Sequence, residues 1–253
     1  MYDLSRFSLT DMTRCGSSLR KLGLGATSME EAADRVVRHL HDNFIAGDTG
    51  RRSCVLVRFF KTHRYDSLDP ELQAFADRVL DSPPASADMR CLTLLASSGE
   101  RAEWNGRTHS VGHKVIPLPS PQAVHRIPMI ARLIKQLGLE ITTLVDPSTS
   151  LMVDDEQRSY NVFYVADAAG SPHIPAQKDF VVPLGIRSVL GFGGILPLGD
   201  LFTVILFSTV AIPRETLDLF RPLALCTKAA VLPFVGGPVF AHRIARPNTP
   251  SHG

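Results

Sequence analysis

Three arginines interrupt or precede apolar segments of the sequence: Arg58 within residues 54–60 (CVLVRFF), Arg90 before 91–96 (CLTLLA), and Arg187 before 188–192 (SVLGF). A charge inside a strand must be paired or face water. One interpretation is that these guanidinium groups bind an anionic ligand through two parallel hydrogen bonds. The other is that they pair with Asp or Glu at the rim of a sheet, and the sequence leaves both open.

A ligand pocket needs an apolar enclosure with a few polar groups aimed into it. Ten residues fit that description because they are polar or aromatic and lie in or beside apolar segments. The candidate ligand-binding residues are Arg58, Lys61, Arg90, Trp104, Asn105, His113, Asn161, His173, Gln177 and Arg187.

Metal chemistry is not indicated by the spacing of the ligand-type residues. His113 and His173 are single histidines in loop-like stretches, and neither belongs to a His, Cys and Asp cluster with metal spacing. The acidic stretch 146–156 is interpreted as a solvated loop or short helix. We expect no metal site.

Thiol and hydrolase chemistry also lack their motifs. Cys15, Cys54, Cys91 and Cys226 are far apart without Cys-x-x-Cys spacing, which predicts buried thiols in a reducing compartment. Ser188 is not in a Gly-x-Ser-x-Gly turn, and the chain has neither a phosphate-binding loop nor a dinucleotide-binding glycine pattern. We therefore expect no catalytic residues.

The composition is that of a globular protein, with 44% hydrophobic and 21% charged residues and a net charge of +2 over 253 residues. Such a small charge gives no electrostatic case for binding nucleic acid or an anionic membrane. Residues 181–212 are largely apolar, but Arg187 and Asp200 divide them into runs shorter than the roughly 20 residues of a spanning helix. The N-terminus has no signal-peptide pattern, so we expect a cytoplasmic protein without a membrane span.

The elements that position the candidates follow from hydrophobic periodicity. An amphipathic helix within residues 1–26 is followed by helices at 28–44, 70–80, 121–137 and 213–231, and by strands at 54–60, 90–96, 159–165, 188–192 and 201–208. Residues 104–116 are expected to contain another extended segment. This order predicts an α+β fold with an antiparallel sheet of about six strands and flanking helices, the N- and C-terminal helices side by side.

A hairpin formed by residues 188–208 organises the chain. Gly199 and Asp200 precede the apolar segment 201–208 (LFTVILFS) and indicate a turn. Gly191, Gly193 and Gly194 would weaken a strand unless it bends, bulges, or admits a second backbone or a ligand.

The segments 180–194 (FVVPLGIRSVLGFGG), 201–208 and 212–234 resemble the C-terminal half of a GAF domain. The resemblance extends from Ser28 to about Phe234 and is closest to the N-terminal GAF-like domains of bacterial sensor histidine kinases. It implies a PAS/GAF-type sheet with a pocket on one face and frequent dimerisation. The domain organisation implied is an N-terminal helical arm (1–26), a sensory domain (27–234) with an inserted helical segment around 120–158, and a flexible tail (235–253).

The functional implication is a non-catalytic sensory module of two-component signal transduction. It would bind an unidentified small molecule and act on a histidine kinase or other output domain as a homodimer. The signature of cyclic-nucleotide-binding members is absent, and His173 stands where bilin-binding members carry Asp, without a following Cys-His pair. The cofactor is thus unknown, and we expect neither haem nor bilin. A dimerisation scaffold without ligand and a thiol-dependent reductase using Cys54 and Cys91 are the alternatives.

Overall fold

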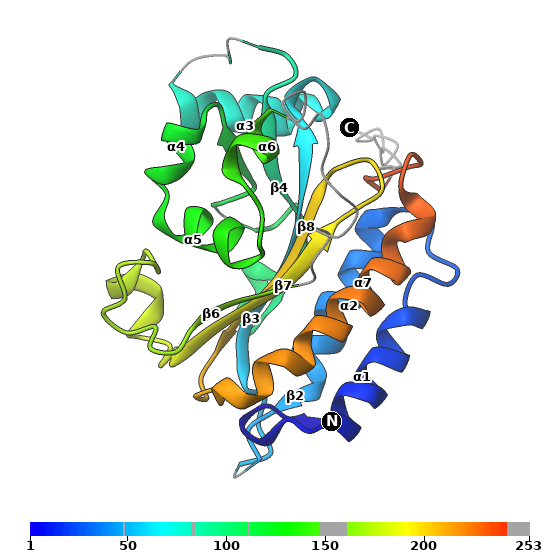
Figure 1. Ribbon diagram of the computed structural model, residues 1–253, viewed down its shortest axis with the longest axis vertical. Helices are drawn as coiled ribbons and strands as arrows, with labels where there is room; N and C mark the ends of the chain where they lie inside the picture. The colour runs from blue at the N-terminus through cyan, green and yellow to red at the C-terminus, as the bar shows by residue number, and fades with distance from the viewer. Residues whose placement is uncertain (48, 82–83, 85, 111, 147–160, 242–253) are drawn as a thin grey trace, which may run out of the picture.

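The computed structural model describes residues 1–253 except 48, 82–83, 85, 111, 147–160 and 242–253 (Figure 1). Its centre is a six-stranded antiparallel sheet in the order β5-β4-β3-β8-β7-β6. The strands are β3 (Cys54–Arg64), β4 (Arg90–Gly99), β5 (Val115–Leu118), β6 (Val162–Val165), β7 (Ser188–Ile195) and β8 (Leu201–Ser208). A parallel pair, β1 (Tyr2–Asp3) and β2 (Phe44–Ile45), lies apart from this sheet. The predicted α+β plan with an antiparallel sheet is confirmed.

Helices α2, α3 and α4 each begin at a side-chain cap. Ser28 and Asp69 accept hydrogen bonds from the first turns of α2 and α3, and Ser120 does the same for α4. The described α-helices are α1 (Leu9–Lys21), α2 (Met29–Asn43), α3 (Pro70–Leu80), α4 (Pro121–His125), α5 (Pro128–Gln136), α6 (Ile141–Val145) and α7 (Phe220–Val231).

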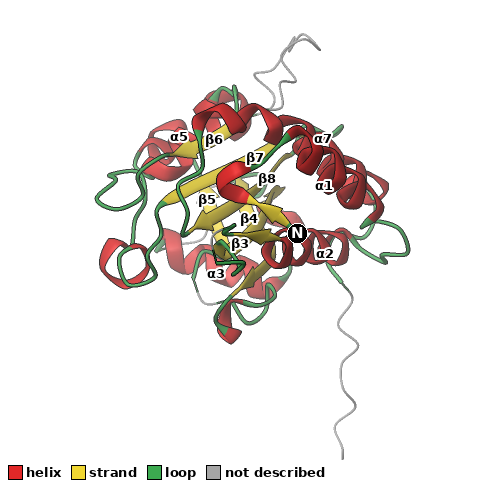
Figure 2. Cartoon of the chain, turned by 90° about the horizontal axis from the view of Figure 1, so that it is seen from below, coloured by secondary structure: helices red, strands yellow, loops and turns green. Residues whose placement is uncertain are grey.

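The two faces of the sheet carry different layers. Helices α1, α2 and α7 cover one face, and α4, α5 and α6 lie on the other (Figures 1 and 2). Because successive residues of a strand point to opposite faces, Val57 and Phe59 enter the core beneath α2, whereas Leu56 and Phe60 enter the core beneath α5. The central strands therefore contact both layers through alternate residues.

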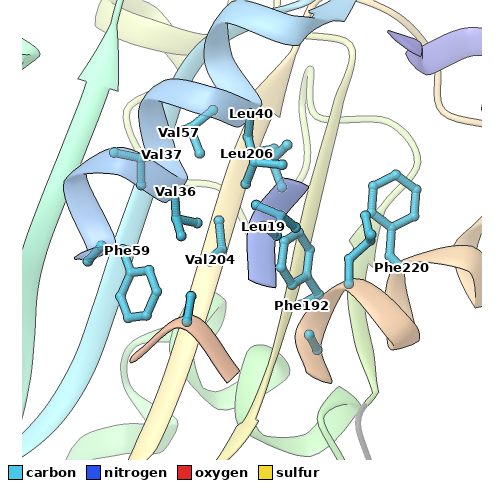
Figure 3. Packing of buried hydrophobic residues seen from close by; sticks show 14 of the residues in the cluster. Leu19, Val36, Val37, Leu40, Val57, Phe59, Phe192, Val204, Leu206 and Phe220 are labelled. Carbon is cyan, nitrogen blue, oxygen red and sulfur yellow. The ribbon is translucent and has the colours of Figure 1, made fainter. Parts of the chain in front are cut away.

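The helical layer is closed by aromatic and aliphatic packing. Phe220 of α7 stacks on Phe7 with ring centroids 4.9 Å apart and also contacts Phe44 and Phe192. Leu19 of α1 and Val36 of α2 complete the same cluster (Figure 3). Helices α1 and α7 lie side by side, as predicted.

The predicted hairpin forms, and its register places Ser188 opposite Ser208 and Ile195 opposite Leu201. Gly193 explains part of the glycine pattern: a Cβ there would collide with the backbone carbonyl oxygen of Phe202 and lie 2.9 Å from Cα of Thr203. The glycine admits a second backbone, which was one of the conditions under which a strand tolerates it.

Several predicted elements differ in extent from those observed, and β3, β4 and β7 each extend beyond the strand predicted there. The helix expected over 121–137 is two helices, because Pro128 has no N–H and disfavours helical geometry at Ile127, whose φ and ψ are −109° and 86°. Residues 102–104 form a short 3-10 helix, and the extended segment expected within 104–116 is instead β5, beginning at Val115. The strand expected at 159–165 begins at Val162, after Asn161, which lies outside the strand, and residues 159–160 are not among the described residues. The helix expected over 213–231 begins as a 3-10 helix, Arg214–Leu219, before α7.

The segment after α7 packs back on the domain. The N–H groups of Met29 and Glu30 at the start of α2 donate to the carbonyls of Pro238 and Val239. Phe240 stacks on His63, centroids 5.3 Å apart, and lies beneath the Arg107 guanidinium. The tail boundary at residue 235 remains a prediction, and residues 242–253 and most of the acidic stretch 146–156 lie outside the described residues.

Within the described part of the chain, no helix combines the length and the apolarity that crossing a bilayer requires.

Candidate functional site

A cavity of about 240 Å³ lies between the sheet and the layer that contains α5. The sheet contributes Leu56, Arg58 and Phe60 of β3, Ile116 of β5, and Ile205 and Phe207 of β8. The opposite wall is made by residues on or beside α5 and in the segment before β7, with Trp104 and His113 from the loop between β4 and β5. These opposite-wall residues are Ile127, Met129, Ile130, Ile174, Pro175, Ala176 and Phe180. The lining is apolar except at a few points, which is the usual make-up of a small-molecule pocket.

Arg58 is the charged group of this lining. The residue is 8% exposed, and Nη2 donates a 3.0 Å hydrogen bond to Oγ of Ser110. Its Nε is buried without a hydrogen-bond partner, and among the described residues no carboxylate pairs with it. Desolvation lowers the pKa of the Arg58 guanidinium to about 10, so it stays charged at neutral pH.

Two residues of the lining hold an unusual backbone conformation. His113 and Ala176 have positive φ values of 52° and 58°, although neither is a glycine. Left-handed non-glycine residues are costly and persist where the surrounding structure imposes them, often at ligand sites. Burial, together with the positive charge of Arg58, lowers the pKa of the His113 imidazole, so this ring is neutral at neutral pH.

Trp104 and Asn105 sit at the start of the loop between β4 and β5. The Trp104 ring packs edge-on against Phe180, centroids 5.5 Å apart, beneath the guanidinium of Arg101 at 4.8 Å. The Asn105 amide binds the backbone N–H and carbonyl of Gly99 and the carbonyl of Arg101. Asn105 therefore fixes the loop that carries Trp104 and does not line the cavity.

Lys61 and Arg90 form a different site, at the β7–β8 turn. The Asp200 carboxylate lies 2.6 Å from Nζ of Lys61 and 2.7 Å from Nη1 of Arg90. Thr62 adds a hydroxyl contact to Asp200, and the same hydroxyl accepts the N–H of Leu201. The ion-pair interpretation thus holds for Arg90, whereas Arg58 has no such partner in the described structure.

The other candidates lie away from the cavity lining. Asn161 immediately precedes β6, and Arg187 is exposed at the entrance of β7. The Gln177 amide binds the carbonyls of Ala168 and Ile174 and the N–H of Gly170, which closes the loop before the cavity wall. His173 lies in that loop with its Nδ1 buried and unpartnered. Of the ten candidates, the structure brings Arg58, Trp104 and His113 together.

Most residues of the cavity were not among the candidates, because they are apolar and their patterns predict core positions equally well. Ile127 and Ile130 lie in the predicted helix 121–137, and Ile205 and Phe207 lie in the predicted strand 201–208. Ser110, which binds Arg58, lies in a polar stretch with no distinguishing pattern. Period-2 alternation on β3 and β8 identifies Leu56 and Phe207 as sharing the face of Arg58, but the wall opposite them depends on long-range packing.

Cys54 and Cys91 are not brought together. Cys91 pairs with His63 in the sheet, nine residues along β3 from Cys54, which at about 3.3 Å per residue separates them by roughly 30 Å. Both are fully buried, and desolvation raises the pKa of each thiol to about 12. This geometry does not suit a reductase that uses the two cysteines together. Among the described residues, no group of three or more His, Cys, Asp or Glu side chains is placed to hold a metal ion.

His63 is buried among cations. It lies near Lys61, Arg90 and Arg107, and its Nδ1 is 3.2 Å from the Lys61 carbonyl oxygen, while Nε2 has no partner. Burial, followed by these positive charges, lowers the pKa of His63 well below its usual value. His63 is therefore neutral in the folded protein at neutral pH.

The depressed pKa predicts an acid-sensitive fold. Below about pH 6.5, His63 becomes protonated in the unfolded chain but stays neutral in the folded chain. The free energy of unfolding therefore falls as the pH falls. In His63→Gln this loss should be smaller, by up to about 1.4 kcal/mol per pH unit between pH 6 and 5. Urea denaturation across pH 5–8 measures it, with His125→Gln on the exposed side of α4 as the control. Equal slopes for parent and His63→Gln would contradict the assignment.

The fold is an α+β domain with a cavity between its antiparallel sheet and the layer that contains α5. No family model matches the chain, and no curated protein matches it in sequence. Solved structures of similar fold include the GAF domain of a phosphoenolpyruvate-protein phosphotransferase from Coxiella burnetii, at 13% identity over 87% of this chain and 91% of that one, with a TM-score of 0.43.

Two further structures are similar at the same level. One is the free methionine-R-sulfoxide reductase from Neisseria meningitidis in complex with its substrate, at 12% identity over 87% of this chain and 90% of that one, TM-score 0.43. The other is the phycoerythrobilin-bound GAF domain of a cyanobacterial phytochrome, at 10% identity over 90% and 98%, TM-score 0.41. These likenesses concern the fold alone.

Proposed function

We propose that this chain is a non-catalytic sensory module that binds a small, largely apolar molecule in the cavity beside Arg58. The observation that carries the proposal is the cavity itself, an apolar enclosure of about 240 Å³ with a buried, incompletely bonded guanidinium on its wall. A packed interior has few voids larger than a water molecule, so a space of this size with an aimed polar group is suited to a ligand.

Transmission would run through the sheet to the terminal helices. Leu56 and Phe60 touch the cavity, while Val57 and Phe59 between them on β3 pack under the helical layer. On β8, Ile205 and Phe207 alternate in the same way with Val204 and Leu206. A ligand that prefers one position of these strands would shift the population of α1 and α7 arrangements. The output would be a histidine kinase or another signalling domain in the cytoplasm, as the resemblance implies.

A thermal-shift panel tests the binding step. Octan-1-ol, octanamide, octanoate and indole are added to the purified chain, and at least one should raise the melting temperature in a concentration-dependent manner. Ile205→Phe, which fills the cavity from β8, should abolish the shift. Leu198→Phe, exposed at the hairpin turn, should preserve it. A panel without any shift, or a shift that Ile205→Phe leaves intact, would contradict the proposal.

The helical layer would also form the interface of a homodimer. Leu9 of α1, Leu225 of α7 and Leu232 just beyond it are exposed by 65%, 53% and 42%. Burial of such apolar side chains would favour an interface on the helical layer. Light scattering of Leu225→Glu should show a monomer where the parent is dimeric. A monomeric parent protein would contradict the proposed homodimer.

A further inference from the structure

Arg58 differs from the other buried cations that the structure describes. Lys61 and Arg90 share the carboxylate of Asp200. Arg107, 6% exposed, pairs with Glu30 and Asp69. Each of these cations has an anionic partner, and Arg58 has a hydroxyl group only. A buried cation without a countercharge is costly, so an external anion is the missing partner that the site would accept most favourably.

The donors around Arg58 fit a carboxylate. The guanidinium presents its N–H groups in a planar fork, and Nε is free while Nη2 is held by Ser110. The Ser110 hydroxyl accepts from Nη2 and retains its own proton for donation to a second acceptor. His113 is neutral and adds one donor or acceptor without a second positive charge. One positive charge matches one carboxylate better than a phosphate with two negative charges.

The rest of the cavity determines the polarity and size of the ligand's remaining part. Ile127, Met129, Ile205 and Phe207 offer it no polar atoms beyond the backbone. A cavity of about 150 Å³ is known to hold benzene, so 240 Å³ accommodates a short acyl chain or a single ring. Resting on the proposed function, we propose that the ligand is an amphipathic monocarboxylate, its carboxylate bound by Arg58 and its apolar body enclosed between β3, β8 and α5.

The test uses Trp104, the chain's sole tryptophan, whose ring lines the cavity. Its fluorescence is followed during titration with octanoate, with neutral octanamide and octan-1-ol, and with cationic octylamine. Octanoate should bind at least about tenfold more tightly than either neutral molecule, because an ionic hydrogen-bonded pair is stronger than a neutral one, and octylamine should not bind. Binding of octanoate should be constant between pH 7 and 8.5, where Arg58 and the carboxylate are both charged.

Arg58→Gln isolates the charge. It should weaken octanoate binding by about tenfold or more while octanamide binds within a few-fold of the parent, which also shows that the variant has folded with its cavity intact. Arg64→Gln, at the exposed end of the same strand, is the matched control and should bind octanoate as the parent does. If octanamide or octan-1-ol binds as tightly as octanoate, or if Arg58→Gln keeps full octanoate affinity, the carboxylate assignment is wrong although the pocket stands. If none of the molecules binds, the proposed function fails with it.

Discussion

Asp200→Asn should destabilise the protein by about 3–5 kcal/mol, the usual cost of removing one partner of a buried ion pair. Asp200 is the carboxylate that neutralises both Lys61 and Arg90, whose side chains are 6% and 13% exposed. The amide would leave two neighbouring cations without a countercharge in a desolvated site. Urea denaturation at pH 7 measures the change in the free energy of unfolding.

The control for this prediction is an ion pair that water screens. Asp66→Asn breaks the exposed contact with Arg64 and should cost less than about 1 kcal/mol. Adding Lys61→Met to Asp200→Asn should recover part of the lost stability, since it removes one of the stranded charges. Asp200→Asn within 1 kcal/mol of the parent would show that the triad is solvated and not structurally important.

Gly193→Ala should cost about 2–3 kcal/mol, although alanine is ordinarily the better residue in a strand interior. The added methyl group would meet the Phe202 carbonyl and Cα of Thr203, which are backbone atoms of the paired strand β8. Neither can move without disturbing the β7–β8 ladder. Because β8 also carries Ile205 of the cavity, ligand affinity should fall together with stability.

Gly191→Ala is the matched control two residues away. Its Cβ would lie 3.3 Å from the Phe163 ring and from the Val204 carbonyl, a contact that small shifts relieve. Its cost should stay below about 1 kcal/mol. Equal costs for the two variants in thermal or urea denaturation would refute the close-approach explanation.

Local sequence patterns predict most of the helices and strands. The helices predicted at 28–44 and 70–80 and the strand predicted at 201–208 are observed with nearly the same bounds. Apolar residues recur on both sides of Pro128 and so predict one helix, although a proline inside a helical pattern itself indicates a break.

The residues of the site are harder to predict from the sequence, and Arg58 and Arg90 show why. Both are arginines in strands with the same two interpretations, and what separates them is Asp200, more than 100 residues away from either. Partners that distant in sequence come from strand order and register, which local periodicity does not specify. Ser110 and Ala176 were missed for the same reason.

Under the proposed function, a ligand in the cavity changes the arrangement of the terminal helices α1 and α7. Amide hydrogen exchange, with and without saturating octanoate or octan-1-ol, tests it most directly. With ligand bound, amide hydrogens around α5 and residues 174–181 should exchange more slowly than in the free protein. In the same experiment, the exchange rates of α1 and α7 should also change. Protection confined to the cavity wall, with α1 and α7 unchanged at saturation, would contradict it.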